Sequence, residues 1–123
     1  MPGFNGIGWF EIGTDDPAAA RRFYGDVLGW TAAGDADSST YQIVTTGDPE
    51  GLHGGLFATE GKMPNYAIFT VLVEDVDATC RKTEQAGGKV QRAKQVSPDG
   101  LAFAYLLDPA GNQFGVFTPP ASP

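Results

Sequence analysis

The sequence is poor in the residues that form disulfides, metal centres and membrane spans. Cys80 is the only cysteine, so no intrachain disulfide can form, and a reducing compartment, the cytoplasm, is expected. His53 is the only histidine, which leaves few of the nitrogen ligands that transition metals prefer. No apolar run approaches the ~18 residues that a membrane-spanning helix needs, so no membrane partner is expected.

Basic residues are also scarce. The chain has 8 Lys and Arg against 15 Asp and Glu, which gives a formal net charge of −7 at pH 7. Nucleic-acid binding depends on clustered Lys and Arg that displace counterions, and a scattered set in an acidic chain does not supply them. A neutral or cationic small molecule is the easier partner to attract. The length of 123 residues fits one domain, residues 1–123, with its own core.

The sequence does contain an internal repeat. Asp48-Pro49-Glu50-Gly51 matches Asp108-Pro109-Ala110-Gly111 at an offset of 60 residues (108 minus 48), and a later Gly and Phe follow in both copies. Upstream, Asp16 and Asp75 stand 59 residues apart (75 minus 16), each at the expected start of a helix. Two matches at nearly one offset indicate a duplicated module. We expect units at about 5–58 and 66–118, joined by a linker at 59–65.

Each unit is predicted to contain a strand, a helix and three further strands. Alternation over residues 6–13 is typical of a strand, Asp16 before Pro17 predicts a helix N-terminus, and Gly29 predicts its end. The expected strands are 6–13, 30–33, 40–45, 52–58, 67–73, 89–93, 101–107 and 112–117. The second helix is expected at 76–86.

The fold class expected is therefore α+β, with two tandem βαβββ units whose mixed sheets form a curved, barrel-like cleft with the helices outside. A right-handed crossover makes the first and last strands of each unit parallel. Alternation predicts one set of residues under the helices: Phe10, Ile12, Leu56, Phe69, Val71, Val73, Phe114 and Val116. The cleft set is Trp9, Glu11, His53, Gly55, Phe57, Ile68, Thr70, Leu72, Gln113, Gly115 and Phe117. Phe23, Tyr24 and Trp30 are expected in the core.

Three motifs stand in a characteristic order along the chain. They are a strand at 9–13 followed by Asp16, the run from Phe23-Tyr24 to Gly29-Trp30, and Asp108-Pro109-Ala110-Gly111-Asn112 before the last strand. In this the chain resembles the vicinal oxygen chelate superfamily of glyoxalases, bleomycin-resistance proteins and extradiol dioxygenases. The resemblance implies a small-molecule ligand and a homodimer, which some members form by exchanging units between chains. It implies no single reaction, since one fold hosts many chemistries.

The resemblance also implies positions for a metal. Enzymes of the superfamily hold a divalent metal with His, Glu or Gln from the first and last strand of each unit. Carried over by spacing, these positions are Trp9, Gly55, Ile68 and Gly115. None of the four can ligate a metal through its side chain, so no cofactor is predicted.

A register shift of two residues offers another set: Glu11, His53, Thr70 and Gln113. If Trp9 pairs with Gly55, the shift places Glu11 and His53 four residues apart, about 13 Å at ~3.3 Å per residue. A metal ion does not bridge that distance. A divalent metal at a shifted site remains the alternative to a metal-free pocket.

The predicted pocket is apolar and aromatic, with Glu11 as its one inward carboxylate. The expected ligand contacts are Trp9, Glu11, His53, Phe57, Ile68, Thr70, Leu72, Gln113 and Phe117. The first hypothesis is a metal-free protein of the bleomycin-resistance type that sequesters or carries an apolar or aromatic compound. This compound is either neutral or cationic. The alternatives are a metal-dependent glyoxalase- or dioxygenase-type enzyme using Glu11 and His53, and a metal-free enzyme with Glu11 as general base. The sequence does not decide whether a reaction is catalysed.

Overall fold

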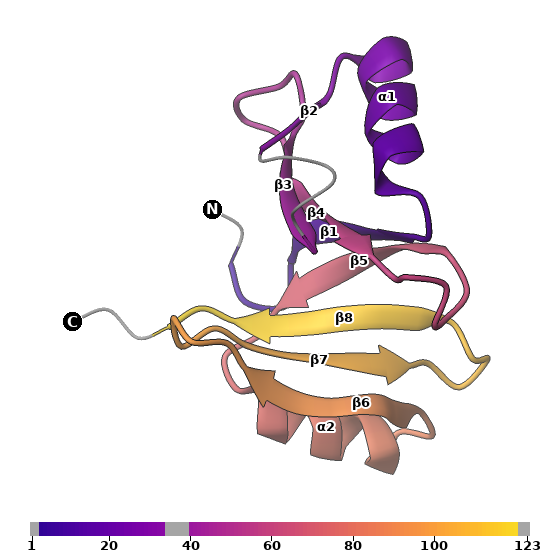
Figure 1. Ribbon diagram of the computed structural model, residues 1–123. Helices are drawn as coiled ribbons and strands as arrows, with labels where there is room; N and C mark the ends of the chain where they lie inside the picture. The colour runs from indigo at the N-terminus through magenta and orange to yellow at the C-terminus, as the bar shows by residue number, and fades with distance from the viewer. Residues whose placement is uncertain (1–2, 34–39, 121–123) are drawn as a thin grey trace. The chain divides into compact units, whose positions relative to one another are not determined.

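The computed structural model describes residues 3–33 and 40–120, which form two compact units (Figure 1). The N-terminal unit comprises residues 9–68, and the C-terminal unit combines residues 1–8 with 69–123. The first residues join the C-terminal unit through the backbone, where Asn5 N–H donates to the Leu72 carbonyl at 2.6 Å. The boundaries of the two repeat units, 5–58 and 66–118, stay a prediction.

The order of the elements confirms the α+β class and the tandem βαβββ pattern. The elements are β1 (Ile7–Thr14), α1 (Pro17–Leu28), β2 (Thr31–Ala32), β3 (Tyr41–Thr45), β4 (Gly54–Ala58), β5 (Tyr66–Leu72), α2 (Val76–Gln85), β6 (Lys89–Val96), β7 (Ala102–Leu107) and β8 (Gln113–Thr118). The predicted helices match these bounds to within one residue. The strand that differs most is β6, which continues to Val96.

The helices begin and end where their capping residues predict. Asp16 Oδ1 accepts a hydrogen bond from Ala19 N–H at 3.0 Å, and Asp75 Oδ1 accepts one from Ala78 N–H at 3.1 Å. Gly29 ends α1 with φ 73°, a left-handed conformation that favours glycine. Among the described residues, no helix is long and apolar enough to cross a membrane.

The sheet in each unit is mixed, as predicted. The strand order is β2-β3-β4-β1 in the N-terminal unit and β5-β8-β7-β6 in the C-terminal unit. β1 and β4 are parallel, and so are β5 and β8, as a right-handed crossover requires. The other pairs within each unit are antiparallel. A curved cleft between the two sheets stays a prediction.

Each helix covers one face of its own sheet, which we call the helix face; the other side is the opposite face. The buried core of the N-terminal unit is Ile12, Val44 and Leu56, and that of the C-terminal unit is Val73, Val76, Ala104, Leu106 and Val116. Phe10, Val71 and Phe114 pack against these cores, so the predicted helix-face alternation is confirmed for them. Phe69 is 46% exposed but stacks on Phe114, with ring centroids 5.7 Å apart.

The prediction that Phe23 belongs to the core is wrong, because its side chain is 57% exposed. Tyr24 and Trp30 do pack against the core, with their rings stacked at 5.3 Å. α1 meets its sheet through a narrow stripe that includes Ala20 and Tyr24. Phe23 is turned about 100° around the helix from Tyr24 and therefore faces away from the sheet.

The Asp-Pro-x-Gly-Asn motif before β8 is a structural turn. Asp108 Oδ1 accepts hydrogen bonds from Ala110 N–H at 3.0 Å and Asn112 N–H at 2.9 Å, and Asn112 Nδ2 donates to Oδ2 at 3.0 Å. The hydrogen bonds from the Asn112 side chain and backbone lower the pKa of Asp108 below its ordinary value. This carboxylate is therefore used in closing the turn.

Candidate functional site

Two of the four expected metal positions, Trp9 and Gly55, converge on the hydroxyl of Tyr41. Trp9 Nε1 donates a hydrogen bond to Tyr41 Oη at 3.0 Å. A Cβ at Gly55 would overlap that hydroxyl and the adjoining ring carbon. The absence of a side chain at residue 55 therefore makes room for the Tyr41 phenol at a position where enzymes of the superfamily would place a metal-ligating side chain.

The third position, Gly115, is covered by a threonine. Gly115 pairs with Thr70 in the parallel ladder between β5 and β8. A Cβ at Gly115 would lie 3.1 Å from both Oγ1 and Cγ2 of Thr70, which is buried. The fourth position, Ile68, offers only aliphatic carbon. None of the four positions supplies a metal-binding atom.

Glu11 is a buried carboxylate with a phenol partner. Its side chain is 6% exposed, and the Tyr66 hydroxyl donates to Glu11 Oε2 at 2.6 Å. Its neighbours Phe10 and Ile12 pack on the helix face, so Glu11 lies on the opposite face, as predicted. Tyr66 lies against Gly13, where a Cβ would overlap the tyrosine ring. This short hydrogen bond holds the Glu11 side chain in one orientation.

The strand register differs from the one assumed from spacing. Glu11 pairs with Gly55, whereas the assumed partner of Gly55 was Trp9. The predicted separation of about 13 Å between Glu11 and His53 is therefore wrong, because the two are offset by two residues, or about 7 Å along the strands. Alternation determines the face of a residue but not its pairing partner across the ladder.

The other predicted contact residues fall into two groups. In the N-terminal unit, Phe57 contacts Tyr41 with ring centroids 6.4 Å apart, and His53 is half-buried just before β4. His53 Nδ1 is buried and has no hydrogen-bond partner in the described part of the chain. The C-terminal group on the opposite face is Thr70, Leu72, Gln113 and Phe117, with Leu72 paired to Phe117. One pocket lined by both groups stays a prediction.

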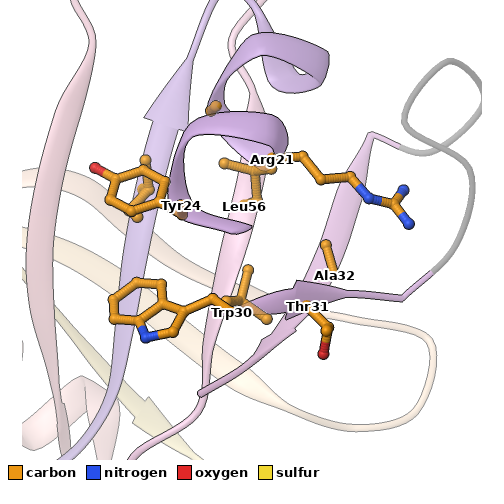
Figure 2. A pocket seen from close by; sticks show the side chains of 9 residues that line it. Arg21, Tyr24, Trp30, Thr31, Ala32 and Leu56 are labelled. Carbon is orange, nitrogen blue, oxygen red and sulfur yellow. The ribbon is translucent and has the colours of Figure 1, made fainter. Parts of the chain in front are cut away.

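A shallow pocket lies on the helix face of the N-terminal unit (Figure 2). Its lining is Ile12, Ala20, Arg21, Tyr24, Trp30, Thr31, Ala32, Val44 and Leu56. In Figure 2 the Arg21 guanidinium points away from the two rings, and its Nη1 donates to Gln42 Oε1 at 3.3 Å. The pocket is a gap in the packing of α1 on its sheet.

Tyr41 and Tyr66 contact the predicted site most directly, although no sequence motif indicates either of them. Each approaches a glycine within a strand: Tyr41 lies at Gly55 and Tyr66 at Gly13. A glycine inside a strand often marks a close approach by another group, so both glycines were signals. Neither glycine identifies the group that approaches.

The remaining acidic and thiol side chains do not build a metal centre. Within residues 3–33 and 40–120, no group of three or more His, Cys, Asp or Glu side chains is close enough to hold an ion. Glu11 and His53, the shifted pair, are not joined by a third ligand of these types.

Comparison with protein families identifies the chain's relatives. Residues 6–116 match the model of the Glyoxalase/Bleomycin resistance protein/Dioxygenase superfamily. The chain belongs to this superfamily. The resemblance drawn from the three sequence motifs is thereby confirmed.

Two curated relatives have related sequences. CFP32 of Mycobacterium tuberculosis, named as a candidate glyoxylase, is 34% identical over 113 residues, which are 90% of this chain and 43% of that protein. The anthracycline biosynthesis protein DnrV of Streptomyces peucetius is 36% identical over 112 residues, 89% of this chain and 40% of that protein. The chain thus spans about two-fifths of the length of these relatives.

Solved structures share the fold of this superfamily member. The Mn(II)-bound glyoxalase from Novosphingobium aromaticivorans has a TM-score of 0.64 and 21% identity, covering 98% of this chain and 42% of that one. Methylmalonyl-CoA epimerase from Mycobacterium tuberculosis has a TM-score of 0.61 and 16% identity, covering 98% and 93%. At these identities the likeness concerns the fold alone.

Proposed function

We propose that this superfamily member binds a small, largely apolar aromatic compound and uses no metal to do so. The observation that carries the proposal is the filling of the metal positions, where the Tyr41 hydroxyl occupies the space beside Trp9 and Gly55. Ligand contacts are proposed on the opposite face of each sheet. Those in the N-terminal unit are Trp9, Glu11, His53, Phe57 and Ile68, and those in the C-terminal unit are Thr70, Leu72, Gln113 and Phe117.

The residues at the family's metal positions do not fit a divalent cation. Indole, isoleucine and glycine side chains offer no anionic oxygen, imidazole nitrogen or thiolate. Glu11, beside Gly55 in the ladder, already accepts a hydrogen bond from Tyr66. No catalytic step through a metal follows from these residues.

The N-terminal unit favours a positively charged group on the ligand. Among the described strand residues on its opposite face, Glu11 is the only carboxylate, and no Lys or Arg stands on these strands. Trp9 is two residues away on the same face of β1, and an indole ring attracts cations through its π-system. We therefore propose an aromatic ammonium compound as the ligand chemistry of this unit.

A Glu11→Gln variant tests this proposal, since glutamine keeps the shape and can still accept the Tyr66 hydrogen bond. Binding of 1-naphthylmethylammonium, measured by isothermal titration, is expected to weaken about tenfold, the loss of roughly 1.4 kcal/mol from one charge pair. Binding of neutral 1-naphthylmethanol should stay within about twofold of the unaltered protein. The control is Glu50→Gln, which removes an exposed carboxylate from a turn of the same unit. Equal ammonium affinity in both variants contradicts the role of Glu11.

Catalysis by Glu11 as a general base is the second candidate function. The observation in its favour is a buried carboxylate held at 2.6 Å by a phenol, an arrangement that fixes a base in one orientation. The probe is 1-acetonaphthone, whose methyl protons exchange with deuterated water when a base removes them. Exchange that is accelerated by the protein and lost in Glu11→Gln with affinity retained supports catalysis. No acceleration supports binding alone.

We also propose that the domain works in the cytoplasm as a homodimer, including a form with exchanged units. The single cysteine and the exposed apolar side chains of Phe23 and Val27 on α1 support this. Light scattering during size exclusion should give the mass of two chains. The mass of one chain at micromolar concentration contradicts the dimer.

A further inference from the structure

The basic residues are less evenly distributed than the sequence analysis supposed. Of the 8 Lys and Arg, five lie within residues 81–94: Arg81, Lys82, Lys89, Arg92 and Lys94. The first two are on α2 and the other three on β6. β6 is the edge strand of the C-terminal sheet. Its side chains alternate between the two faces of the sheet.

Two of these cations lie on the opposite face, Lys89 by regular pairing and Arg92 through a bulge. Val90 packs against the core and pairs with Leu106, so it lies on the helix face. Lys89 pairs with Leu107, which is on the opposite face by alternation. Arg92 pairs with Tyr105, because an extra residue is inserted between Val90 and Arg92. Bulges of this kind re-aim side chains and are common beside functional sites.

Within residues 3–33 and 40–120, the two cations on this face form no ion pair. Lys94, by contrast, bonds Asp77 of α2 at 2.7 Å on the helix side. Within the described residues, neither Lys89 nor Arg92 has a carboxylate oxygen within 4.0 Å. Their charges are therefore available to a ligand.

The strands of the C-terminal sheet contribute no carboxylate to its opposite face. The acidic residues of residues 69–120 lie on α2 or in the connections, and β6, β7 and β8 contain none. In a chain of net charge −7, the described strand residues on this face therefore include two cations and no acid. The cations stand beside half-buried aromatic rings, since Phe103 and Tyr105 meet edge to face at 6.2 Å.

One row across this face begins at Arg92 and ends at Gly115 and Thr70, which are buried. Arg92 pairs with Tyr105, Tyr105 with Gly115, and Gly115 with Thr70. Neighbouring strands are ~4.8 Å apart, so Arg92 lies directly beside Tyr105, which is half-buried. An aromatic ring lying against the Tyr105 ring would place a substituent within reach of the guanidinium. Guanidinium groups bind carboxylates through two parallel hydrogen bonds.

We propose that the opposite face of the C-terminal unit binds an aromatic carboxylate, with the ring against Tyr105 and Phe103 and the carboxylate on Arg92 and Lys89. The inference rests on the proposed ligand-binding function and adds the charge of the group bound at this unit. It concerns a different unit from Glu11, so the two charge preferences are tested separately.

The test is isothermal titration of the whole chain with 1-naphthoate and with neutral 1-naphthylmethanol. Naphthoate is expected to bind about tenfold more tightly, and Arg92→Gln should remove that advantage. Lys89→Gln should weaken naphthoate binding severalfold. The matched control is Arg81→Gln, an exposed arginine on α2, which should leave the affinity within about twofold. Circular dichroism spectra of all variants confirm that each is folded.

Each outcome decides a separate point. Equal affinity for naphthoate and naphthylmethanol overturns the carboxylate site while the aromatic binding proposal stands. Binding of neither probe overturns both. Equal loss in Arg92→Gln and Arg81→Gln shows a general effect of net charge and overturns the site. Competition by inorganic phosphate at the affinity of naphthoate shows a simple anion site and overturns the aromatic part.

Discussion

A Gly13→Ala variant is expected to lower the free energy of unfolding by about 2–5 kcal/mol, one of the two largest effects of a single substitution expected here. A Cβ at residue 13 would overlap the Tyr66 ring, which lies against the strand at this point. The ring must then move, and its hydroxyl leaves Glu11, a carboxylate that is 6% exposed. Urea unfolding followed by tryptophan fluorescence measures the loss.

A double-mutant cycle separates this account from a general intolerance of alanine in β1. In a Tyr66→Ala background there is no ring to displace, so Gly13→Ala should cost less than about 1 kcal/mol. Gly47→Ala is the control, because no atom lies within 4 Å of a Cβ at that position. Its effect should be small and of either sign. Additive losses in the cycle contradict the proposed contact.

A Leu106→Ala variant is expected to lower the free energy of unfolding by about 2–5 kcal/mol, because it leaves a cavity in the C-terminal core. Leu106 is 0% exposed and packs with Val76 and Val116. Leu28→Ala, at a position that is 51% exposed, should cost less than about 1 kcal/mol. Thermal and urea unfolding of both variants measure the difference.

The same variant tests whether the core and the ligand face are separable. Leu106 and Tyr105 are neighbours on β7 and point to opposite sides of the sheet. Below the unfolding transition, Leu106→Ala should therefore bind 1-naphthoate within about twofold of the unaltered protein. A large loss of affinity in a folded Leu106→Ala protein contradicts the assignment of faces.

Most of the fold could be predicted because local signals agreed with the repeat. Asp16 and Asp75 mark helix N-termini by a mechanism that the structure shows directly, and Gly29 ends α1 in the left-handed conformation. Alternation assigned Ile12 and Val116 to the helix faces correctly. Phe23 was misplaced because helical spacing alone does not show how narrow the contact stripe of α1 is.

The candidate site could be predicted only in part. Spacing located Trp9, Gly55 and Glu11, but the ladder register that sets Glu11 beside Gly55 is a long-range property that alternation does not determine. Tyr41 and Tyr66 reach the site from other strands. The sequence signals for them were the strand glycines that they approach. Arg92 reaches its face through a bulge, which strand periodicity does not reveal.

The central claim is that a phenol, an indole and bare backbone occupy the places of the family's metal ligands. The most direct test is elemental analysis of untagged protein, incubated with a mixture of Zn, Ni, Mn and Fe(II) salts and then desalted without chelator. We predict far less than one ion of any of these metals per chain, and no change in melting temperature upon their addition. Stoichiometric retention of one metal, with a higher melting temperature, would contradict the account.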